Sequence, residues 1–231
     1  EYDYIYPKIS PNGEKLLYGS RLKQPGQSFH IKVADMNKIC STIDKYIDGK
    51  NKFRERKYSQ LEFNPNKNTL KNIGSVYFQE EEYNDLFGGQ HREFSPVDTD
   101  FLSSKLFRYL LKFDFEFFLK QKLLKNKIYK MGVHQIRTIA KLQQSGLVTP
   151  EGIHKDGHPV FALHLVNRQN INGGVTNLYN NNFGKIDTFT LKNFGDTVCI
   201  NDNLVYHEVT PINQKDENKF GFRDILIIEF Y

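Results

Sequence analysis

The 231-residue sequence predicts an α+β fold with a mainly β core, an antiparallel sandwich or barrel, and N-terminal helices packed on one face. Apolar residues before residue 128 recur at helical intervals, whereas residues 128–231 divide into short extended runs. Turn sequences such as "NINGG", "NNNFGK" and "KNFGD" separate these runs, with no helix-sized gap between them. No repeat or Ser/Gly linker divides the chain, so we expect one domain, residues 1–231, in which a helix-rich part, 1–127, packs on a core formed by 128–231.

Two segments of the N-terminal part have the apolar stripe of an amphipathic helix. One covers residues 31–49, and the other covers residues 97–124 with Asp98 or Thr99 as its N-cap. These are the helices that we expect to cover the β core.

Strand-length runs fill much of the remaining sequence. They are rich in Val, Ile, Phe and Tyr, and Gly and Asn stand between them. The expected extended segments are residues 53–65 and 71–84, then 127–141, 159–168, 174–180, 185–192, 196–203, 204–212 and 223–231.

The charge of the chain favours a small anionic ligand over a polyanion. Thirty-two Lys and Arg against 27 Asp and Glu give a net charge of +5, but the two signs interleave and leave no basic tail. The most basic segment, residues 107–130, has the lysine spacing of a solvated helix face. We therefore expect no nucleic-acid partner.

The sequence also favours a cytoplasmic protein without a membrane anchor. No apolar run approaches the roughly 20 residues of a membrane span, and the first residues do not have the pattern of a signal peptide. Cys40 and Cys199 are the two cysteines, and their wide separation gives no disulfide framework. The oligomeric state is not indicated.

The stretch "PEGIHKDGHP", residues 150–159, contains a possible metal clamp or an ordinary polar turn. His154 and Asp156 are two positions apart, so in extended backbone both side chains point to the same side. His207, at the end of a later predicted strand, is the natural third ligand. Two imidazoles and a carboxylate on one face of an octahedron leave three open positions, as in non-haem Fe(II) oxygenases, whereas zinc is usually held tetrahedrally with one.

Three open positions suit a bidentate co-substrate, and a dicarboxylic keto acid needs a cation for its far end. Arg223 precedes the last apolar run, and its guanidinium can bind a carboxylate with two parallel hydrogen bonds. An arginine there would by default be a surface charge, but the triad favours the functional interpretation.

In this order, His154-x-Asp156, His207 and Arg223 resemble the 2-oxoglutarate/Fe(II)-dependent dioxygenases, whose core is a double-stranded β-helix, a jelly-roll or cupin-like fold. The strings "TPEGIHKDG", "LHLVNRQNINGGVTNLY" and "VYHEVTPI", followed by "FRDILIIEF", are similar to the bacterial branch that hydroxylates free L-amino acids. The resemblance covers roughly residues 128–231.

The resemblance implies a role for each motif residue. His154, Asp156 and His207 would bind Fe(II), and Arg223 would anchor the distal carboxylate of 2-oxoglutarate. O2 would be consumed and succinate and CO2 released as a free amino acid, aliphatic like Ile, Leu or Met, is hydroxylated. The generic family pattern has Ser or Thr two positions after the arginine, where this chain has Ile225, so we consider Thr210 as the assisting hydroxyl.

Other polar residues are weaker candidates. Gln135 and Arg137 alternate on one predicted strand and would either face a substrate together or face solvent together. His164, among apolar neighbours, is expected to be a hydrogen-bonded core residue, and His158 to be exposed. Further expectations are a solvated loop or site border at Asn167 and Arg168, and a tight turn at Gly173 and Gly174.

Two alternatives stay open at this point. The first is a cupin-type metal protein without oxygenase chemistry, which would have no need of Arg223. The second is the same oxygenase chemistry on a peptide, nucleic acid or other small molecule, although no continuous basic groove with interleaved aromatic residues is evident. For a free amino acid, Arg54, Arg56 and Arg92 are available as charged partners.

Overall fold

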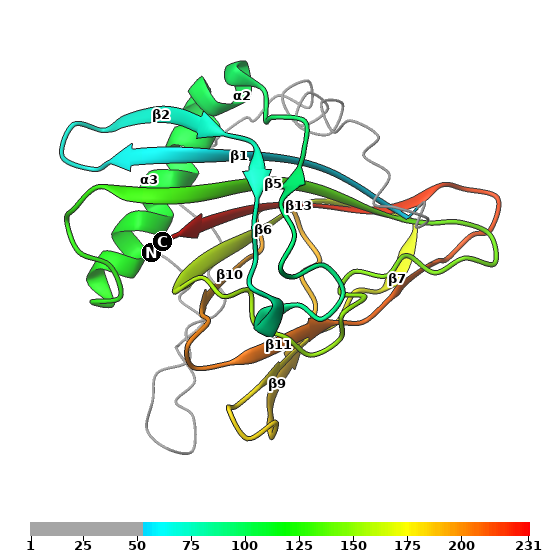
Figure 1. The fold of residues 1–231 in the computed structure, drawn as a ribbon. Helices are drawn as coiled ribbons and strands as arrows, with labels where there is room; N and C mark the ends of the chain where they lie inside the picture. Colours follow the sequence, from blue (N-terminus) through cyan, green and yellow to red (C-terminus); the bar gives the residue numbers. More distant parts are fainter. Residues whose placement is uncertain (1–52) are drawn as a thin grey trace, which may run out of the picture.

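The computed structural model describes residues 53–231, so the helix expected at 31–49 lies outside the described residues. The described chain forms three layers: a long helix, a large antiparallel sheet, and smaller sheets on the opposite side (Figure 1). This is the helix-covered β core that the sequence predicts.

The large sheet contains strands from both the N-terminal and the C-terminal part of the chain. Its order is β10-β6-β13-β5-β1-β2, and each neighbouring pair is antiparallel. The 11-residue strand β1 pairs along nearly its whole length with β5, so the segment expected to be a short strand or extended segment is a long strand of the main sheet, between β5 and β2. The bounds are β1 Arg54–Asn64, β2 Thr69–Gly74, β5 Tyr129–Ala140, β6 Val160–Gln169, β10 Thr197–Asn201 and β13 Gly221–Phe230.

The smaller sheets lie opposite one face of the large sheet. One has the order β11-β8-β9, another pairs β12 with β7, and a short hairpin-like pair joins β3 and β4. The bounds are β3 Val76–Tyr77, β4 Arg92–Glu93, β7 Ile171–Gly173, β8 Thr176–Tyr179, β9 Lys185–Phe189, β11 Tyr206–Val209 and β12 Ile212–Gln214.

Apolar side chains from the two sheets meet in an interior cluster. The large sheet contributes alternate residues of β5, β6, β10 and β13, and the smaller sheet contributes Leu178 of β8. The buried members are Ile136, Phe161, Leu165, Leu178, Leu191, Val198, Ile200, Val205 and Ile225. This cluster fixes which residues of each strand face the interior.

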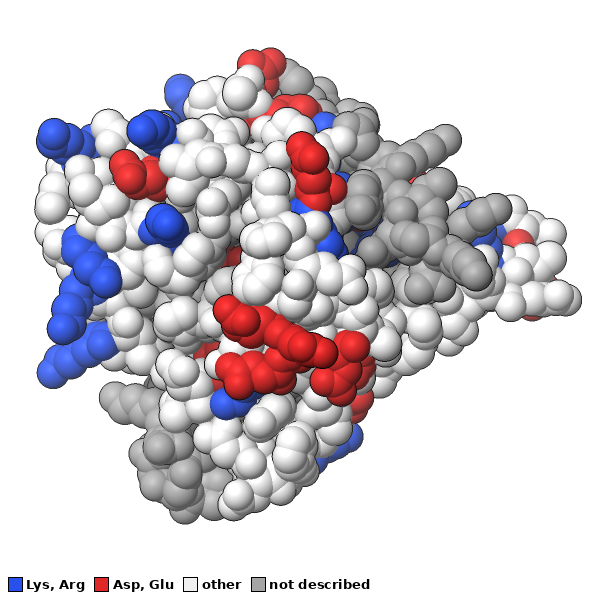
Figure 2. Space-filling view, in the orientation of Figure 1, with Lys and Arg blue, Asp and Glu red and all other residues white. Residues whose placement is uncertain are grey.

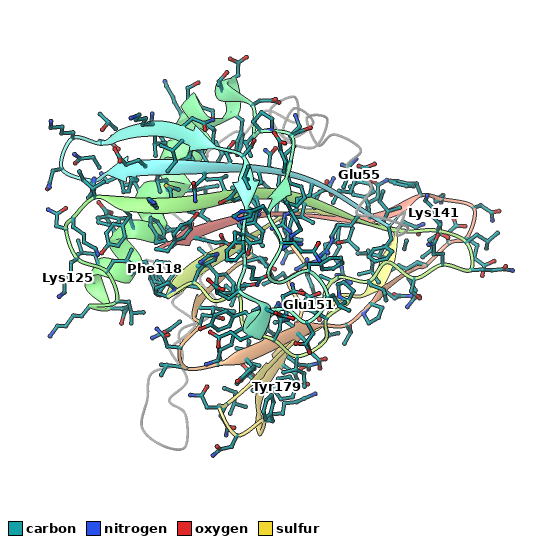
Figure 3. All side chains as sticks on the ribbon, in the orientation of Figure 1. Glu55, Phe118, Lys125, Lys141, Glu151 and Tyr179 are labelled. Atoms are coloured by element: carbon teal, nitrogen blue, oxygen red, sulfur yellow. The ribbon has the colours of Figure 1, made fainter. Side chains whose placement is uncertain are left out.

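The helix layer covers the other face of the large sheet. The segment expected as one helix, 97–124, forms α2 (Thr99–Ser103) and α3 (Lys105–Lys120), because Ser104 adopts an extended conformation between them. The Ser104 hydroxyl accepts a hydrogen bond from the Phe107 amide at 3.2 Å and caps α3. From α3, Phe118 is fully buried against the sheet (Figure 3).

His164 is a hydrogen-bonded core residue, as predicted. Its Nδ1 lies 2.8 Å from Thr197 Oγ1, and its Nε2 lies 2.9 Å from Asp114 Oδ2 of α3. His164 therefore joins the sheet to the helix layer and takes no part in the interior.

The segment "NINGG" departs from the expectation of a simple turn. Asn170 and both glycines have positive φ, but Ile171–Gly173 is also strand β7, paired with β12. A Cβ on Gly173 would collide with the Pro211 carbonyl, so this close approach of two backbones requires glycine. None of the helices between residues 53 and 231 is long and apolar enough to cross a membrane.

Candidate functional site

An antiparallel bridge brings the two histidines of the candidate triad together. The His154 amide donates to the His207 carbonyl at 3.0 Å, and the His207 amide donates to the His154 carbonyl at 2.9 Å. The ring centroids of these residues lie 4.3 Å apart. The segment before β6 is thus joined directly to β11.

Asp156 completes the triad that the sequence predicts. Its Oδ1 lies 3.5 Å from His154 Nε2, and its Oδ2 lies 3.6 Å from His207 Nε2. One donor atom from each of the three residues falls within 4.8 Å of the others. Adjacent ligand atoms about 2.1 Å from a metal lie about 3 Å apart, so a small closure of these side chains would place one cation among them. The three residues therefore fit a metal ion.

The tautomer of His154 suits a metal ligand. Its Nδ1 donates to the Gly152 carbonyl at 2.9 Å, so Nε2, which faces Asp156, is the nitrogen that would bind a metal ion in place of its proton. Burial lowers the pKa of His154, but the carboxylates of Asp156 and Glu151 outweigh burial and raise this pKa to about 9. The negative charge is therefore concentrated where a cation would bind.

The other two ligands respond to the same electrostatics. Burial and the charge of His154 lower the pKa of His207 to about 3, opposed by Asp156. Burial raises the pKa of Asp156, but both histidines outweigh burial and hold this pKa well below its usual range. His207 is thus neutral and Asp156 ionised, the forms that bind a metal.

A segment from the N-terminal part covers the triad. It runs from β3 through the 3-10 helix η1 (Glu81–Tyr83) across the front of the large sheet towards β11 (Figure 1). Gln79 Nε2 donates to the Asp156 carbonyl at 3.0 Å, and the Gly157 amide donates to Asp202 Oδ2 at 2.8 Å. Both bonds hold the peptide group between Asp156 and Gly157, directly after the Asp156 side chain.

Glu151 is a site residue that sequence reasoning missed. Its Oε1 lies 3.4 Å from His154 Nε2, and its Oε2 is buried without a hydrogen-bond partner in the described part of the chain. Figure 3 labels it between the large sheet and the smaller sheet. Its position three residues before His154 was the available signal.

Arg223 lies in the interior rather than on the surface. It is 1% exposed, and none of its three guanidinium nitrogens has a hydrogen-bond partner among residues 53–231. A buried unpaired cation is costly, so the position calls for an anion. The Arg223 guanidinium therefore fits the distal carboxylate of a dicarboxylic acid.

Strand β11 of the smaller sheet connects the triad residue His207 with the end of the interior where Arg223 lies. From His207, β11 runs along β8 to Thr210, an extended distance of about 10 Å. The Thr210 hydroxyl accepts a hydrogen bond from the Val175 amide at 3.0 Å and can still donate its own hydrogen. A Cβ built on the adjacent Gly174 would lie 3.7 Å from Arg223 Cδ, so Thr210 is placed near this end of the interior.

The structure does not bring Gln135 and Arg137 to the triad. Ile136, between them in β5, faces the interior cluster, so both flanking side chains point to the helix-covered face. Arg137 Nε and Nη2 donate to the two carboxylate oxygens of Asp224 at 2.7 and 2.8 Å. The expectation of substrate-binding roles is corrected: alternation correctly predicts a shared face, but it is the opposite one.

A buried polar cluster adjoins the triad on the side of β1. The Arg56 guanidinium lies 4.8 Å above the Tyr77 ring, and its Nε donates to His134 Nδ1 at 3.2 Å. His134 Nε2 lies 2.9 Å from Glu229 Oε2. The Arg92 guanidinium lies 5.1 Å from the same Tyr77 ring. Two cations and one carboxylate thus surround an aromatic ring beside the Asp156 segment.

His158 borders this cluster, which corrects the expectation that it is exposed. Its side chain is 13% exposed, because the ring stacks on Tyr231 with centroids 4.6 Å apart. Its Nε2 lies 3.5 Å from Glu229 Oε2. Arg54 lies two residues before Arg56 in β1, and its Nη1 donates to the Val148 carbonyl at 3.4 Å.

We predict that His207→Ala removes divalent-cation binding without unfolding the protein. The substitution leaves two ligands, so the affinity for Mn(II), measured by calorimetry or electron paramagnetic resonance, should fall by more than about 100-fold. His158→Ala is the matched control, since His158 lies in the same segment outside the triad, and its Mn(II) affinity should stay near that of the unmodified protein. Retained binding in His207→Ala would remove His207 from the ligand set.

Comparison with known proteins gives the family. The chain is 33% identical over 180 residues to L-isoleucine-4-hydroxylase from Bacillus thuringiensis, covering 77% of this chain and 74% of that protein. The crystal structure of IDO from Bacillus thuringiensis superposes with a TM-score of 0.71 at 26% identity, covering 86% of this chain and 84% of that one. A bsmA homolog from Methylobium petroleophilum PM1 has the same fold, with a TM-score of 0.74 at 23% identity, covering 86% and 81%.

The family described as 2OG-Fe dioxygenase matches residues 42–229, which include the triad and Arg223. Together with the identity to the Bacillus relative, this match establishes that the chain belongs to the 2OG-Fe dioxygenase family.

Proposed function

We propose that this dioxygenase hydroxylates a free aliphatic L-amino acid. As a member of the family, the enzyme uses Fe(II), 2-oxoglutarate and O2, which excludes the alternative of a cupin-type protein without oxygenase chemistry. When bound, iron and 2-oxoglutarate supply the oxidising chemistry, with succinate and CO2 as co-products. The residues of the chain bind, orient and select the reactants.

The triad and Arg223 define the orientation of the co-substrate in this proposal. His154, Asp156 and His207 would hold the metal through three ligand atoms, and a site with three protein ligands would leave it able to bind 2-oxoglutarate and O2. Arg223 binds the distal carboxylate, and the Thr210 hydroxyl donates a further hydrogen bond to it. The apolar cluster between these ends, which includes Phe161 and Ile225, excludes water from the chain of the co-substrate.

One observation carries the choice of a free amino acid: Arg56 is buried above Tyr77, next to the metal-binding segment. A zwitterion needs a cation for its carboxylate and an anion for its ammonium group. Arg56, with Arg92 beside the same ring, supplies the first charge, and the Glu151 carboxylate near His154 supplies the second. The similarity to an L-isoleucine hydroxylase supports the same substrate class.

The outer surface over the site favours a small substrate over nucleic acid. Glu80, Glu81 and Glu82 are exposed on the segment that covers Asp156. Figure 2 shows acidic side chains gathered over this segment. These carboxylates would repel a polyanion that approached this face, whereas they would not repel a zwitterionic amino acid with no net charge.

We also propose that the whole chain is organised as a single domain. Residues 1–231 act as one dioxygenase domain in which residues 1–127 pack on the core formed by 128–231. Strands from both parts belong to the same large sheet, which supports a single domain. A reducing compartment such as the cytoplasm suits the protein, since Cys199 is a free, buried thiol.

We predict that one or a few aliphatic L-amino acids stimulate succinate formation. Purified protein with Fe(II), ascorbate and 2-oxoglutarate is incubated with each proteinogenic L-amino acid, and mass spectrometry follows the gain of one oxygen atom. The His207→Ala protein is the control for metal-dependent turnover. Absence of stimulation by every amino acid, or stimulation by a peptide or nucleic acid instead, contradicts the proposal.

We predict that Arg56→Gln raises the KM for the amino acid by about tenfold, because a charge-assisted hydrogen bond to the substrate carboxylate is lost. The KM for 2-oxoglutarate should not change. Arg108→Gln, on α3, is the control for loss of a positive charge away from the site. An unchanged KM for the amino acid, or equal changes for both substrates, would show that Arg56 does not bind the carboxylate.

A further inference from the structure

A β-bulge in β6 turns a second arginine toward Arg223. Along β6, Phe161, Leu163 and Leu165 face the interior cluster, so simple alternation would turn Arg168 to the helix-covered face. The pairing with β13 shifts at this point: Leu165 pairs with Ile225, but Asn167 pairs with Asp224. Val166 is the extra residue. Arg168 therefore pairs with Arg223 and lies on the same face.

The position of Arg168 is held by the chain that follows it. Its Nη2 donates to the Gly173 carbonyl at 2.7 Å. Its Nη1 is buried and has no hydrogen-bond partner within residues 53–231. A Cβ built on Gly174 would lie 2.9 Å from Arg168 Nη1 and 3.7 Å from Arg223 Cδ, so both arginines border the same glycine.

The partly buried Arg168 and the fully buried Arg223 carry like charges side by side and destabilise each other. Burial and the charge of Arg168 lower the pKa of Arg223 to about 10, opposed by Asp224. The Asp224 carboxylate, however, is bound by Arg137 on the other face of the sheet. An anion between Arg223 and Arg168 would relieve this repulsion and use the unpaired donors of both.

We propose that Arg168 is a second anchor for the distal carboxylate of 2-oxoglutarate. It would add a second cation beside the Arg223 guanidinium and the Thr210 hydroxyl, at the end of the interior where Gly174 lies against both arginines. The proposal rests on Arg223 as the first anchor. Together the two guanidinium groups select a dicarboxylic keto acid over a monocarboxylic one, since a monocarboxylate would leave the buried Arg223 guanidinium and the Arg168 Nη1 without a partner.

The test measures binding without turnover and without an amino acid. Anaerobic Fe(II)-loaded protein is titrated by calorimetry with 2-oxoglutarate and, separately, with 2-oxobutanoate, which has the same keto acid end but no distal carboxylate. Arg168→Gln should weaken 2-oxoglutarate binding by about tenfold or more and leave 2-oxobutanoate binding unchanged. Arg168→Lys, which retains the charge, should recover part of the affinity.

Asn167→Ala is the matched control, because Asn167 is the neighbouring residue of the bulge and pairs with Asp224 on the opposite face. Its affinity for both keto acids should equal that of the unmodified protein. Unchanged 2-oxoglutarate affinity in Arg168→Gln overturns the proposal, and so does an equal loss for both keto acids, with thermal unfolding recorded for every variant. Because no amino acid is present, these outcomes are independent of the amino-acid substrate proposed above.

Discussion

The reciprocal backbone hydrogen bonds between His154 and His207 are the interaction on which the site depends. They join a segment outside the regular strands to β11 of the smaller sheet, and they bring two imidazoles and Asp156 to one point. Without this bridge the triad would consist of two ligands on one loop and a third on a separate sheet. The pairing of β11 with β8 then leads from this point towards Arg223.

Around Arg223, the two faces of the large sheet differ in how their charged groups are paired. On its helix-covered face, Arg137 and Asp224 pair with each other, and His164 binds Asp114. On its interior face, the guanidinium of Arg223 has no anionic partner in the described chain. The interior face has a pair of its own, His134 with Glu229, but it lies toward β1. At the other end of this face, the unpaired guanidinium of Arg223 marks where an anion would bind. This contrast is the physical basis for assigning the interior to the co-substrate.

Sequence reasoning predicted the triad because the spacing of His154 and Asp156 acts locally, through the two-residue period of extended backbone. It did not predict which face of the sheet the Arg168 side chain is on. That face depends on the β-bulge at Val166, which the alternation of apolar residues does not reveal. For Gln135 and Arg137, the two-residue period of a strand predicted that both side chains lie on the same face of the sheet, but it could not say which face. Glu151 had no periodic signal at all, and its role follows from the distance to His154.

The most direct measurement is a crystal structure of the protein with Mn(II) and 2-oxoglutarate, with the metal located by anomalous scattering. The account predicts one metal bound by Nε2 of His154, Nε2 of His207 and a carboxylate oxygen of Asp156, with the distal carboxylate of 2-oxoglutarate between Arg223 and Arg168. A metal bound elsewhere, or a distal carboxylate that contacts neither arginine, would contradict the account.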